Sequence, residues 1–455
     1  MQIPGNINFR NSATAGDAHF KTGPSSGVIS GVAFYDTASA ANATFVNRGG
    51  DLPGVTVFFD SSTAGNAMIT NHPGNPNGAF TIFLNNSNAG TATIISEGED
   101  SGNSGVQFRD HSSADQSTII AGGGGVGQAG QIATFTDYTT AGSATIIADG
   151  GTRNGAPGGS IIFYSFLGGA ATAENSTLIA NSGSNGGLGG MISFSEGTRG
   201  DNARVELSDG TVLSIESHHP PGMSLGSIEG AGYVTLGANN LTTGNNNLNT
   251  TFSGIIEDGD SGDAGGSLTK IGSGKLTLFS ANTYTGGTTV EGGTLFLTNA
   301  GASNTGTGAV HVNRGTLSGT GIIAGAAIIG DGNGARASLT PGKRARGALT
   351  IQQKLTLNGD ATYNFAINSS TPEAAKVMAK GTIINSGALF SFVDLGNGTI
   401  PPGQVYTVID NHSATPISGA FSNLPDGSTI TVGSNTFQAD YQGGDGNDLT
   451  LTVVP

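Results

Sequence analysis

The chain has 455 residues, of which 78 are glycine and 21 are phenylalanine, and it contains neither cysteine nor tryptophan. The absence of cysteine excludes a disulfide framework and thiolate metal sites, and the low charged fraction of 11% with a formal net charge of −15 excludes the basic stripe that nucleic-acid binding requires. The irregular glycine spacing excludes collagen, and the Gly/Thr/Asn/Ser-rich composition excludes a coiled coil or helical bundle, so we expect an all-β protein with many turns.

The N-terminal sequence MQIPGNINFRNSATAG (1–16) has neither a basic segment nor an apolar core, so no signal peptide is visible. The longest apolar-and-glycine stretch, 321–330, is about half of the ~20 residues that span a bilayer. We therefore expect a mature piece or a fragment of an exported protein, with no transmembrane segment.

A repeat organises the first half of the chain. Its marker is a phenylalanine, found at Phe9, Phe34, Phe58, Phe83, Phe108, Phe135 and Phe194, with intervals of 25, 24, 25, 25 and 27 residues between the first six. A bulky apolar residue follows eleven positions later, at Phe20, Phe45, Ile69, Ile94, Ile119, Ile146 and Val205. A looser copy, one residue longer, joins Phe166 to Leu178.

Polar and small residues align inside the same unit. Two positions after the phenylalanine stand Asn11, Asp36, Asp60, Asn85, Asp110, Asp137 and Glu196. Six positions after it stand Ala15, Ala40, Ala64, Ala89, Ala114 and Ala141. The unit is F-x-[DN]-x-x-x-A-G-x-A-T-[IF]-[IV], followed by a glycine-rich stretch of variable length such as 122–130.

Each unit contains short β-prone runs between turn residues, and none shows a helical period. One unit cannot bury its apolar side alone, but stacked units can, with Phe on Phe and Ile on Ile along the axis. The pattern therefore predicts a parallel β-solenoid. A stack of hairpins or a propeller is the alternative, and the drifting interval disfavours a propeller.

The Asn/Asp column admits two interpretations. Stacked carboxylates could hold a row of cations. Asn and Asp also tolerate a left-handed backbone and accept hydrogen bonds from their own turn. We favour the second interpretation, a turn ladder formed by Asn11, Asp36, Asp60, Asn85, Asp110 and Asp137.

The repeat changes after about Val205. The stretches 224–258 and 265–299 alternate apolar and polar residues between glycine turns. We expect the aliphatic residues of successive strands to point inward: Leu268, Ile271, Leu276, Leu278, Val290, Leu295 and Leu297.

This second stretch resembles the autotransporter-associated β-strand repeat, also called the passenger-associated transport repeat. The residues that carry the resemblance are Gly266 to Leu268, Lys270, Gly272, Gly274, Leu276, Leu278, Asn282 to Thr288 and Gly292 to Leu295. The upstream units and the C-terminal stretches 339–342, 347–351, 420–428 and 441–451 are also similar to such passengers. The resemblance implies a right-handed parallel β-helix that is exported through the cell envelope, and it carries over no catalytic residue.

Such proteins end in a membrane β-barrel, whereas this sequence stops at Pro455 without a matching series of strands. We expect an outer-membrane export module outside this chain and a β-rich cap at its end. The predicted organisation is a repeat-containing β-helix at 1–215, a β-helix with the transport repeat at 216–330 (core 265–299), and terminal coils with a C-terminal cap at 331–455.

Three groups of residues are candidates for metal binding. The segment 443–451, GGDGNDLTL, nearly matches a calcium-binding nonapeptide, with Asp445 and Asp448 as weak candidate ligands, but a second stacked copy is absent. The acidic residues at 257–263 lack the downstream Glu of an EF-hand. The adjacent histidines at 218–219 point to opposite faces of a strand. We favour turns or loops for all three, and expect no metal and no cofactor.

A polysaccharide-cleaving β-helix enzyme is the alternative function, and it needs carboxylates gathered on one lateral face. The densest spot in the repeats, 109–111, corresponds to 59–61 and 136–138 in neighbouring units, so it is typical of repeat variation. A threonine column at Thr44, Thr93, Thr118 and Thr145 is interrupted by His19, Met68 and Arg204, which disfavours ice or mineral binding.

We therefore interpret the chain as a non-catalytic, extracellular or bacterial cell-surface passenger that acts as a rigid stalk or adhesin-like module. Cell-surface glycans or neighbouring cells are its expected partners. A purely structural spacer is the further alternative.

Overall fold

The computed structural model describes residues 7–24, 30–98, 103–126, 130–166, 168–259, 262, 264–298, 301–371 and 373–455. Within these ranges the secondary structure is β-strand, turn and bend, and no helix is long and apolar enough to cross a bilayer. The chain divides into two compact units, Met1–Asn239 and Asn240–Pro455. Each unit is described by itself.

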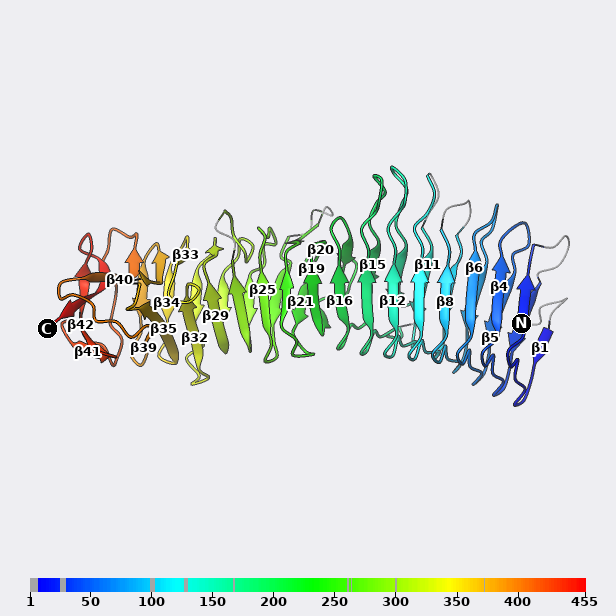
Figure 1. Ribbon diagram of the computed structural model, residues 1–455, viewed down its shortest axis with the longest axis horizontal. Coiled ribbons are helices and arrows are strands. Elements are labelled where there is room, and N and C mark those ends of the chain that lie inside the picture. The colour runs from blue at the N-terminus through cyan, green and yellow to red at the C-terminus, as the bar shows by residue number, and fades with distance from the viewer. Residues whose placement is uncertain are drawn as a thin grey trace. The chain divides into compact units, whose positions relative to one another are not determined.

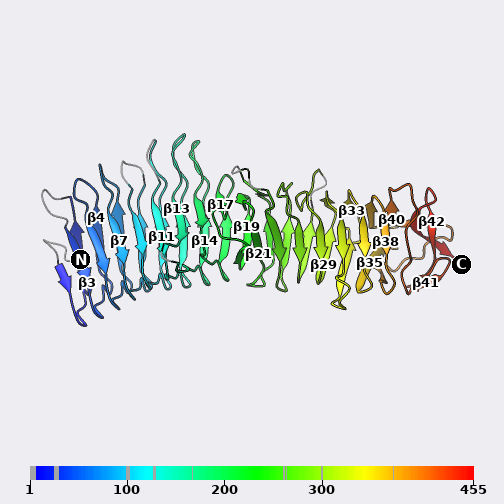
Figure 2. The same ribbon diagram turned by 180° about the vertical axis from the view of Figure 1, so that it is seen from behind.

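The first unit is built from two long parallel sheets. Strands alternate between them along the chain, so each strand pairs with the equivalent strand of the next coil, as the side-by-side arrows of Figures 1 and 2 show. One sheet contains β1 (Ile7–Phe9), β3 (Gly31–Phe34), β5 (Val55–Phe58), β7 (Phe80–Phe83), β9 (Gly105–Phe108), β11 (Ile132–Thr136), β13 (Ser160–Tyr164), β15 (Met191–Phe194), β17 (Val212–Ser214) and β20 (Tyr233–Thr235). The other contains β2 (His19–Thr22), β4 (Thr44–Arg48), β6 (Met68–His72), β8 (Thr93–Ser96), β10 (Thr118–Ala121), β12 (Thr145–Ala148), β14 (Thr177–Ala180), β16 (Arg204–Leu207) and β19 (Ser227–Gly230). β18 (Gly222–Leu225) follows β17 along the chain.

Isolated parallel bridges form a third ladder between the two sheets. They join equivalent residues of successive coils: Thr14, Ser39, Thr63, Asn88, Ser113, Thr140, Thr172 and Arg199. Each coil thus hydrogen-bonds to the next on three sides, which satisfies backbone groups that a lone coil would leave unpaired.

Phenylalanine rings fill the interior of the first unit. Phe83 and Phe108 lie 4.7 Å apart between ring centroids, with planes inclined by 4°. This distance is close to the ~4.8 Å spacing of neighbouring strands, so the rings follow the strand register. Stacked neighbours at 4.6–4.9 Å connect Phe9, Phe34, Phe58, Phe83, Phe108, Phe135, Phe163 and Phe194.

One repeat assignment is wrong. Phe163, rather than Phe166, stacks between Phe135 and Phe194, while Phe166 is 76% exposed. Leu178 does pair with Ile146 as expected. The error arose because this coil carries a longer turn between Phe163 and its second strand, and spacing measured back from Leu178 selected the wrong aromatic residue.

The second unit is also wound in parallel coils and has three ladders of strands. The first contains β21 (Asn240–Thr243), β24 (Ser267–Lys270), β26 (Thr288–Val290), β28 (Val310–Val312), β31 (Ala327–Ile329), β34 (Leu355–Leu357) and β38 (Thr382–Ile384). The second contains β22 (Thr250–Phe252), β25 (Lys275–Leu278), β27 (Thr294–Leu297), β29 (Gly315–Gly319), β32 (Ala337–Pro341), β35 (Ala361–Asn368) and β39 (Leu389–Asp394). β23 (Ile255–Glu257) lies between β22 and β24 along the chain, and β36 (Glu373–Ala374) pairs antiparallel with β35.

The third ladder of this unit changes direction at its end. β30 (Ile322–Ile323), β33 (Ala348–Ile351), β37 (Lys376–Ala379) and β40 (Val405–Asn411) are parallel. β43 (Asp448–Val454), β42 (Asn435–Gly443) and β41 (Thr429–Val432) then continue the sheet antiparallel. Segment 331–455 therefore contains both terminal parallel coils and an antiparallel cap.

These registers confirm the predicted fold class, an all-β parallel solenoid with a β-rich C-terminal cap. The aliphatic residues expected to point inward around the transport repeat are buried, with one exception. At the end of β24 the buried residue is Lys270, which is 1% exposed, and Ile271 is only half-buried. Lys270 takes the inward position because side chains alternate along β24 from Leu268, whereas Ile271 follows the end of the strand. The prediction of Ile271 had followed apolar character in place of this alternation.

Candidate functional site

The predicted turn-ladder residues all occupy the same corner of the first unit. Each has a positive φ, between 54° and 61°: Asn11, Asp36, Asp60, Asn85, Asp110 and Asp137. The backbone N–H of one residue donates to the side-chain oxygen of its counterpart in the next coil, as from Asn85 to Asp110 Oδ2 at 2.8 Å. The same contact runs from Asn11 to Asp36, from Asp36 to Asp60 and from Asp60 to Asn85.

In this geometry the carboxylates act as hydrogen-bond acceptors for the backbone of the neighbouring coil. At least one oxygen of Asp36, Asp60 and Asp110 accepts a backbone N–H that the left-handed turn points away from its own coil. Asp137 accepts from the backbone N–H of Phe166 at 3.1 Å, across the longer turn. Within the described ranges no cluster of three or more His, Asp or Glu residues is arranged to hold a metal ion.

A second polar column lies inside the first unit and was not anticipated. Asn47 and Asn71 are fully buried, and Asn47 Nδ2 donates to Asn71 Oδ1 at 2.9 Å. Thr22 Oγ1 donates to Asn47 Oδ1 at 2.7 Å, and Asn71 Nδ2 reaches Ser96 Oγ at 3.3 Å. The signal in the sequence is a Thr-Asn-Asn-Ser series thirteen positions after the marker phenylalanines, which continues as Ala121 and Ala148 in later coils.

Lys270 is the buried charge of the second unit. Its Nζ donates to the carbonyl oxygens of Ile271 at 2.5 Å, Gly272 at 3.3 Å and Gly292 at 3.4 Å. Gly293 has φ +61°, and a Cβ there would lie 2.9 Å from Nζ, so glycine leaves room for the ammonium group. Burial lowers the pKa of Lys270 to about 8.

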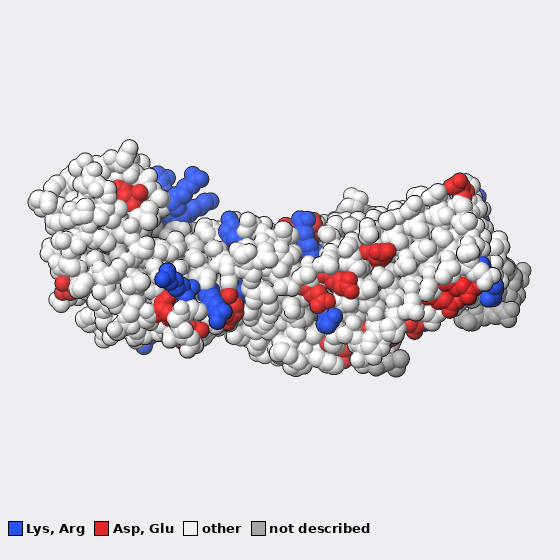
Figure 3. Space-filling model, turned by 90° about the horizontal axis from the view of Figure 1, so that it is seen from below, with Lys and Arg blue, Asp and Glu red and all other residues white. Residues whose placement is uncertain are grey.

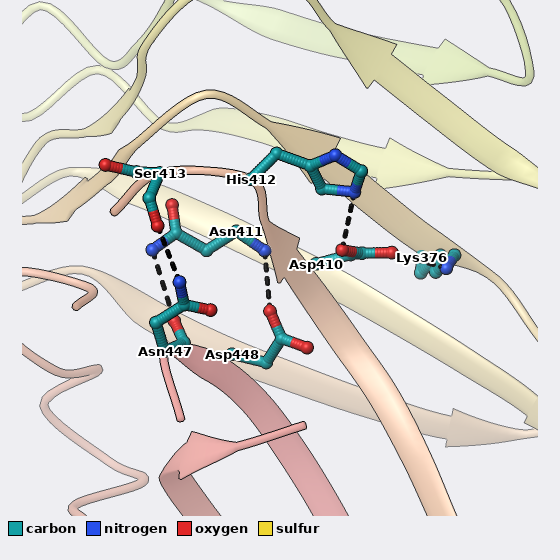
Figure 4. A network of polar contacts seen from close by, with 7 residues as sticks. All are labelled: Lys376, Asp410, Asn411, His412, Ser413, Asn447 and Asp448. Atoms are coloured by element: carbon teal, nitrogen blue, oxygen red, sulfur yellow. Dashed lines mark hydrogen bonds and ion pairs between the residues drawn. The ribbon is translucent and has the colours of Figure 1, made fainter. Parts of the chain in front are cut away.

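The candidate calcium segment forms the tight turn between β42 and β43. Asp445 is exposed at its tip, whereas Asp448 is 8% exposed at the start of β43. Asp448 Oδ1 accepts the backbone N–H of Asn411 at 2.8 Å, as Figure 4 shows. Burial, together with the charges of Asp410 and Asp445, raises the pKa of Asp448. Of the two candidate ligands, one is therefore exposed to solvent and the other is buried. Asp448 joins the cap hairpin to β40 through its hydrogen bond with Asn411.

A polar network surrounds this contact where the parallel coils meet the cap. Asn411 Nδ2 donates to the carbonyl of Asn447 at 3.1 Å, and Asn447 Nδ2 donates to the carbonyl of Ser413 at 2.6 Å. On the other side of β40, Asp410 bridges Lys376 Nζ at 2.6 Å and His412 Nε2 at 2.7 Å (Figure 4). Both Asp410 oxygens are thus occupied by cationic or ring nitrogen atoms.

The other candidate residues are placed separately. His218 Nε2 contacts the carbonyl of Thr198 at 2.7 Å, whereas His219 Nε2 lies 2.5 Å from Glu196 Oε2, so the two rings face different partners. Asp258 accepts from Thr285 Oγ1 at 2.7 Å. Asp260 and Asp263 lie outside the described residues.

Within the segment 109–111 the three side chains also act separately. Arg109 donates to Gln107 Oε1 at 2.8 Å, Asp110 belongs to the turn ladder, and the His111 ring stacks on Tyr138 at 5.1 Å.

Two adjoining grooves follow the second sheet of the first unit. One, of about 340 Å³, is lined by Ile95 and Ile120 with Glu97 and Asp149 among its polar residues. The other, of about 400 Å³, is lined by residues that include Arg48 and the His72–Glu97 pair, whose Nδ1 and Oε2 lie 2.8 Å apart. These grooves were not predicted, because they depend on glycine-rich connections whose path varies from coil to coil.

Comparison with known proteins identifies the repeat of the second unit. The family model of the passenger-associated-transport-repeat matches residues 268–297, which span β24 to β27. The match covers a small part of the chain, and it shows that this part carries a repeat of the type found in autotransporter passengers.

The chain is also similar to the Adhesin BmaC autotransporter of Brucella suis biovar 1 (strain 1330). The two are 30% identical over 205 residues, which cover 43% of this chain and 6% of that protein. The chain therefore spans a small part of its relative's length. The transport repeat and this similarity indicate a secreted or cell-surface location.

A solved structure, the Hap adhesin of Haemophilus influenzae, aligns with 94% of this chain and 64% of its own chain, at 10% identity and a TM-score of 0.26. The assignment of the fold therefore depends on the strand registers of the chain itself.

Proposed function

We propose that this segment is the adhesive, non-catalytic part of a passenger, and that it holds a hydroxyl- and amide-rich lateral surface in register outside the cell. The proposal depends chiefly on one observation, the unshifted stacking of equivalent residues from coil to coil, as in Ile119 on Ile94 and Ile146. Because every coil is fixed by its neighbours, surface groups recur at the ~4.8 Å strand spacing and can engage a partner at many points. The adhesin name of the Brucella relative supports this function.

The non-catalytic part of the proposal is supported by the engagement of the acidic groups. Carboxylates of the turn ladder accept backbone N–H groups, and Asp410 is held by Lys376 and His412. A glycoside hydrolase needs a carboxyl pair about 5–10 Å apart with access to a sugar. Incubation of the chain with a panel of polysaccharides should release no new reducing ends, and measurable release would favour the enzyme alternative.

Adhesion is tested with beads that carry the folded chain. We expect such beads to adhere to epithelial cell layers, and beads carrying the same chain after thermal unfolding to adhere at background level. Equal adherence of the two preparations would contradict the proposal. Background adherence of both would favour the purely structural spacer, because a spacer needs no ligand.

A further inference from the structure

The second unit contains a basic turn. It connects β32 to β33 through residues 342–347 and contains Lys343, Arg344 and Arg346. The whole chain has 17 Lys and Arg residues against 32 Asp and Glu. Figure 3 shows a largely uncharged face from which Lys and Arg side chains project as a group in the C-terminal half. Three cations within four residues are therefore unusual for this protein.

The backbone of this turn is strained, because it holds an arginine in a conformation that suits asparagine or glycine better. Lys343 and Arg346 exchange backbone hydrogen bonds of 2.8 and 3.2 Å, and the central residues Arg344 and Ala345 have φ of 52° and 60°. Positive φ at both central residues is the signature of a type I′ turn, which prefers Asn-Gly. Among the described residues, Arg344 and Ala345 are the one pair of consecutive non-glycine residues at positive φ. Elsewhere the chain uses the favoured pair, Asn185-Gly186.

Strained backbone of this kind persists where the surrounding structure holds it in place, and it is common at functional positions. Ala345 is 2% exposed and anchors the turn, whereas Lys343 and Arg344 are exposed. The base is fixed to a neighbouring coil, because the Gly342 N–H donates to the Gly319 carbonyl at 2.7 Å. The anchored turn therefore holds the side chains of Lys343 and Arg344 out into the solvent.

The charges of the turn are only partly neutralised. Arg346 pairs with Glu373, which also accepts from Thr371 Oγ1 at 3.0 Å. Within the described ranges, Lys343 and Arg344 take part in no ion pair. Polar groups lie beside the turn, since Asn364 Nδ2 donates to Thr340 Oγ1 at 2.9 Å on the adjoining strands. Two free cations next to hydroxyl and amide groups match a chain of sugars that carries sulfate or carboxylate groups.

We propose that the turn Lys343–Arg346 is a binding site for a sulfated or uronate-containing polysaccharide. The inference depends on the proposed adhesive function and names the ligand class for one part of the surface. Arg344 would form paired hydrogen bonds with a sulfate or carboxylate, and Lys343 would add a second point charge. A nucleic acid would need a longer basic stripe, and an anionic membrane would need apolar residues beside the cations.

The probe is heparin, a sulfated polysaccharide, with uncharged dextran for comparison. We expect the full chain to bind heparin and not dextran, with affinity that falls as salt rises. The double variant Lys343→Gln/Arg344→Asn should bind heparin at least about tenfold more weakly. Because asparagine suits a left-handed turn better than arginine, this variant should unfold at no lower temperature than the wild-type chain, which separates lost binding from lost folding.

A control variant completes the test. Arg109→Gln/Arg153→Gln removes two exposed charges from the first unit and should leave heparin binding unchanged. Equal losses in this control and in the turn variant would show diffuse charge attraction and overturn the site.

The remaining outcomes are also decisive. Absence of heparin binding by the wild-type chain would overturn the inference, and so would binding to phosphatidylglycerol vesicles in its place. Heparin binding is measured without cells, so its failure is distinct from failure of adhesion. Beads that adhere to cells while the chain ignores heparin would leave the proposed function standing and remove this ligand class.

Discussion

At the scale of single residues, the aromatic column of the first unit is the main source of packing. Phe34, Phe58, Phe83, Phe108 and Phe135 are fully buried, and each lies between two parallel rings. A ring in such a column loses contacts on both faces if it is truncated, and its neighbours cannot close the gap without breaking the strand register. Buried phenylalanines of this kind contribute several kcal/mol to stability.

Phe108→Ala should therefore reduce the free energy of unfolding of the first unit by about 3–5 kcal/mol. Phe166→Ala is the matched control, because Phe166 is 76% exposed, and it should change stability by less than about 0.5 kcal/mol. Urea denaturation followed by circular dichroism measures both. Equal effects of the two substitutions would contradict the stacked interior.

The buried amine of Lys270 predicts a pH dependence. Its pKa is lowered from 10.5 to about 8 by burial, so between these pH values the unfolded chain binds more protons than the folded one. Stability contributed by this residue therefore rises with pH across that window. The wild type should gain about 3 kcal/mol relative to Lys270→Met between pH 8 and pH 10.5.

The measurement for Lys270 is the difference in unfolding free energy between the two proteins, since other titrating groups cancel in that difference. A difference that stays constant with pH would show that the amine keeps its ordinary pKa in the folded protein.

At the scale of elements, the turn-ladder corner of each coil depends on a residue with positive φ and on its side-chain oxygen, which accepts a backbone N–H from the neighbouring coil. Asp110 supplies both, because it has φ 61° and its Oδ2 accepts from Asn85. The strands on either side are only four residues long, as in β9 and β10. Such short strands do not define the corner by themselves, so the turn residue must contribute to the register.

Three substitutions at Asp110 separate these contributions. Asp110→Asn should be nearly neutral, since asparagine occupies the equivalent position at Asn85. Asp110→Gly keeps the left-handed backbone but loses the acceptor, at a cost of about 1 kcal/mol. Asp110→Ala loses both features and should cost about 1–2 kcal/mol more.

Thermal unfolding with and without calcium completes the Asp110 experiment. The ladder predicts the same melting temperature in both conditions. A calcium-dependent rise in the wild type that Asp110→Asn abolishes would favour the cation row.

At the scale of the whole molecule, the last coil must end the stack without exposing a sheet edge. The second unit does so with β43, β42 and β41, which turn the third ladder antiparallel after β40. Phe437 of β42 lies 4.9 Å from Phe392 of β39, so an aromatic contact fixes the cap to the last coil. Capped ends protect a solenoid from pairing with other chains.

Removal of residues 405–455 should therefore convert the chain from a monodisperse species into associating oligomers, as measured by size-exclusion chromatography with light scattering. Phe437→Ala, which weakens the cap without deleting it, should give an intermediate result. Val405→Thr changes a residue that is 50% exposed and should behave like the wild type. A truncated chain that stays monodisperse would show that the cap does not protect the edge.

The repeat spacing alone determined the all-β class, the parallel stacking and the aromatic interior. A regular spacing favours an arrangement in which equivalent residues lie over one another, so the sequence predicted that Phe83 and Phe108 stack, and they do. The sequence also predicted the turn ladder of Asn and Asp residues, because few residue types other than glycine tolerate a left-handed backbone.

Only the tertiary structure decided which residue fills each inward position where the spacing drifts. It selected Phe163 over Phe166, because a longer turn in that coil shifts the register in a way that periodicity does not record. It also placed Lys270 inside, because alternation along β24 turns this side chain inward despite its charge. It also showed the buried Asn47–Asn71 contact and the junction at Asp410 and Asp448, which join residues from different coils. Such contacts join residues that are distant in the sequence, and they form only when folding brings neighbouring coils together.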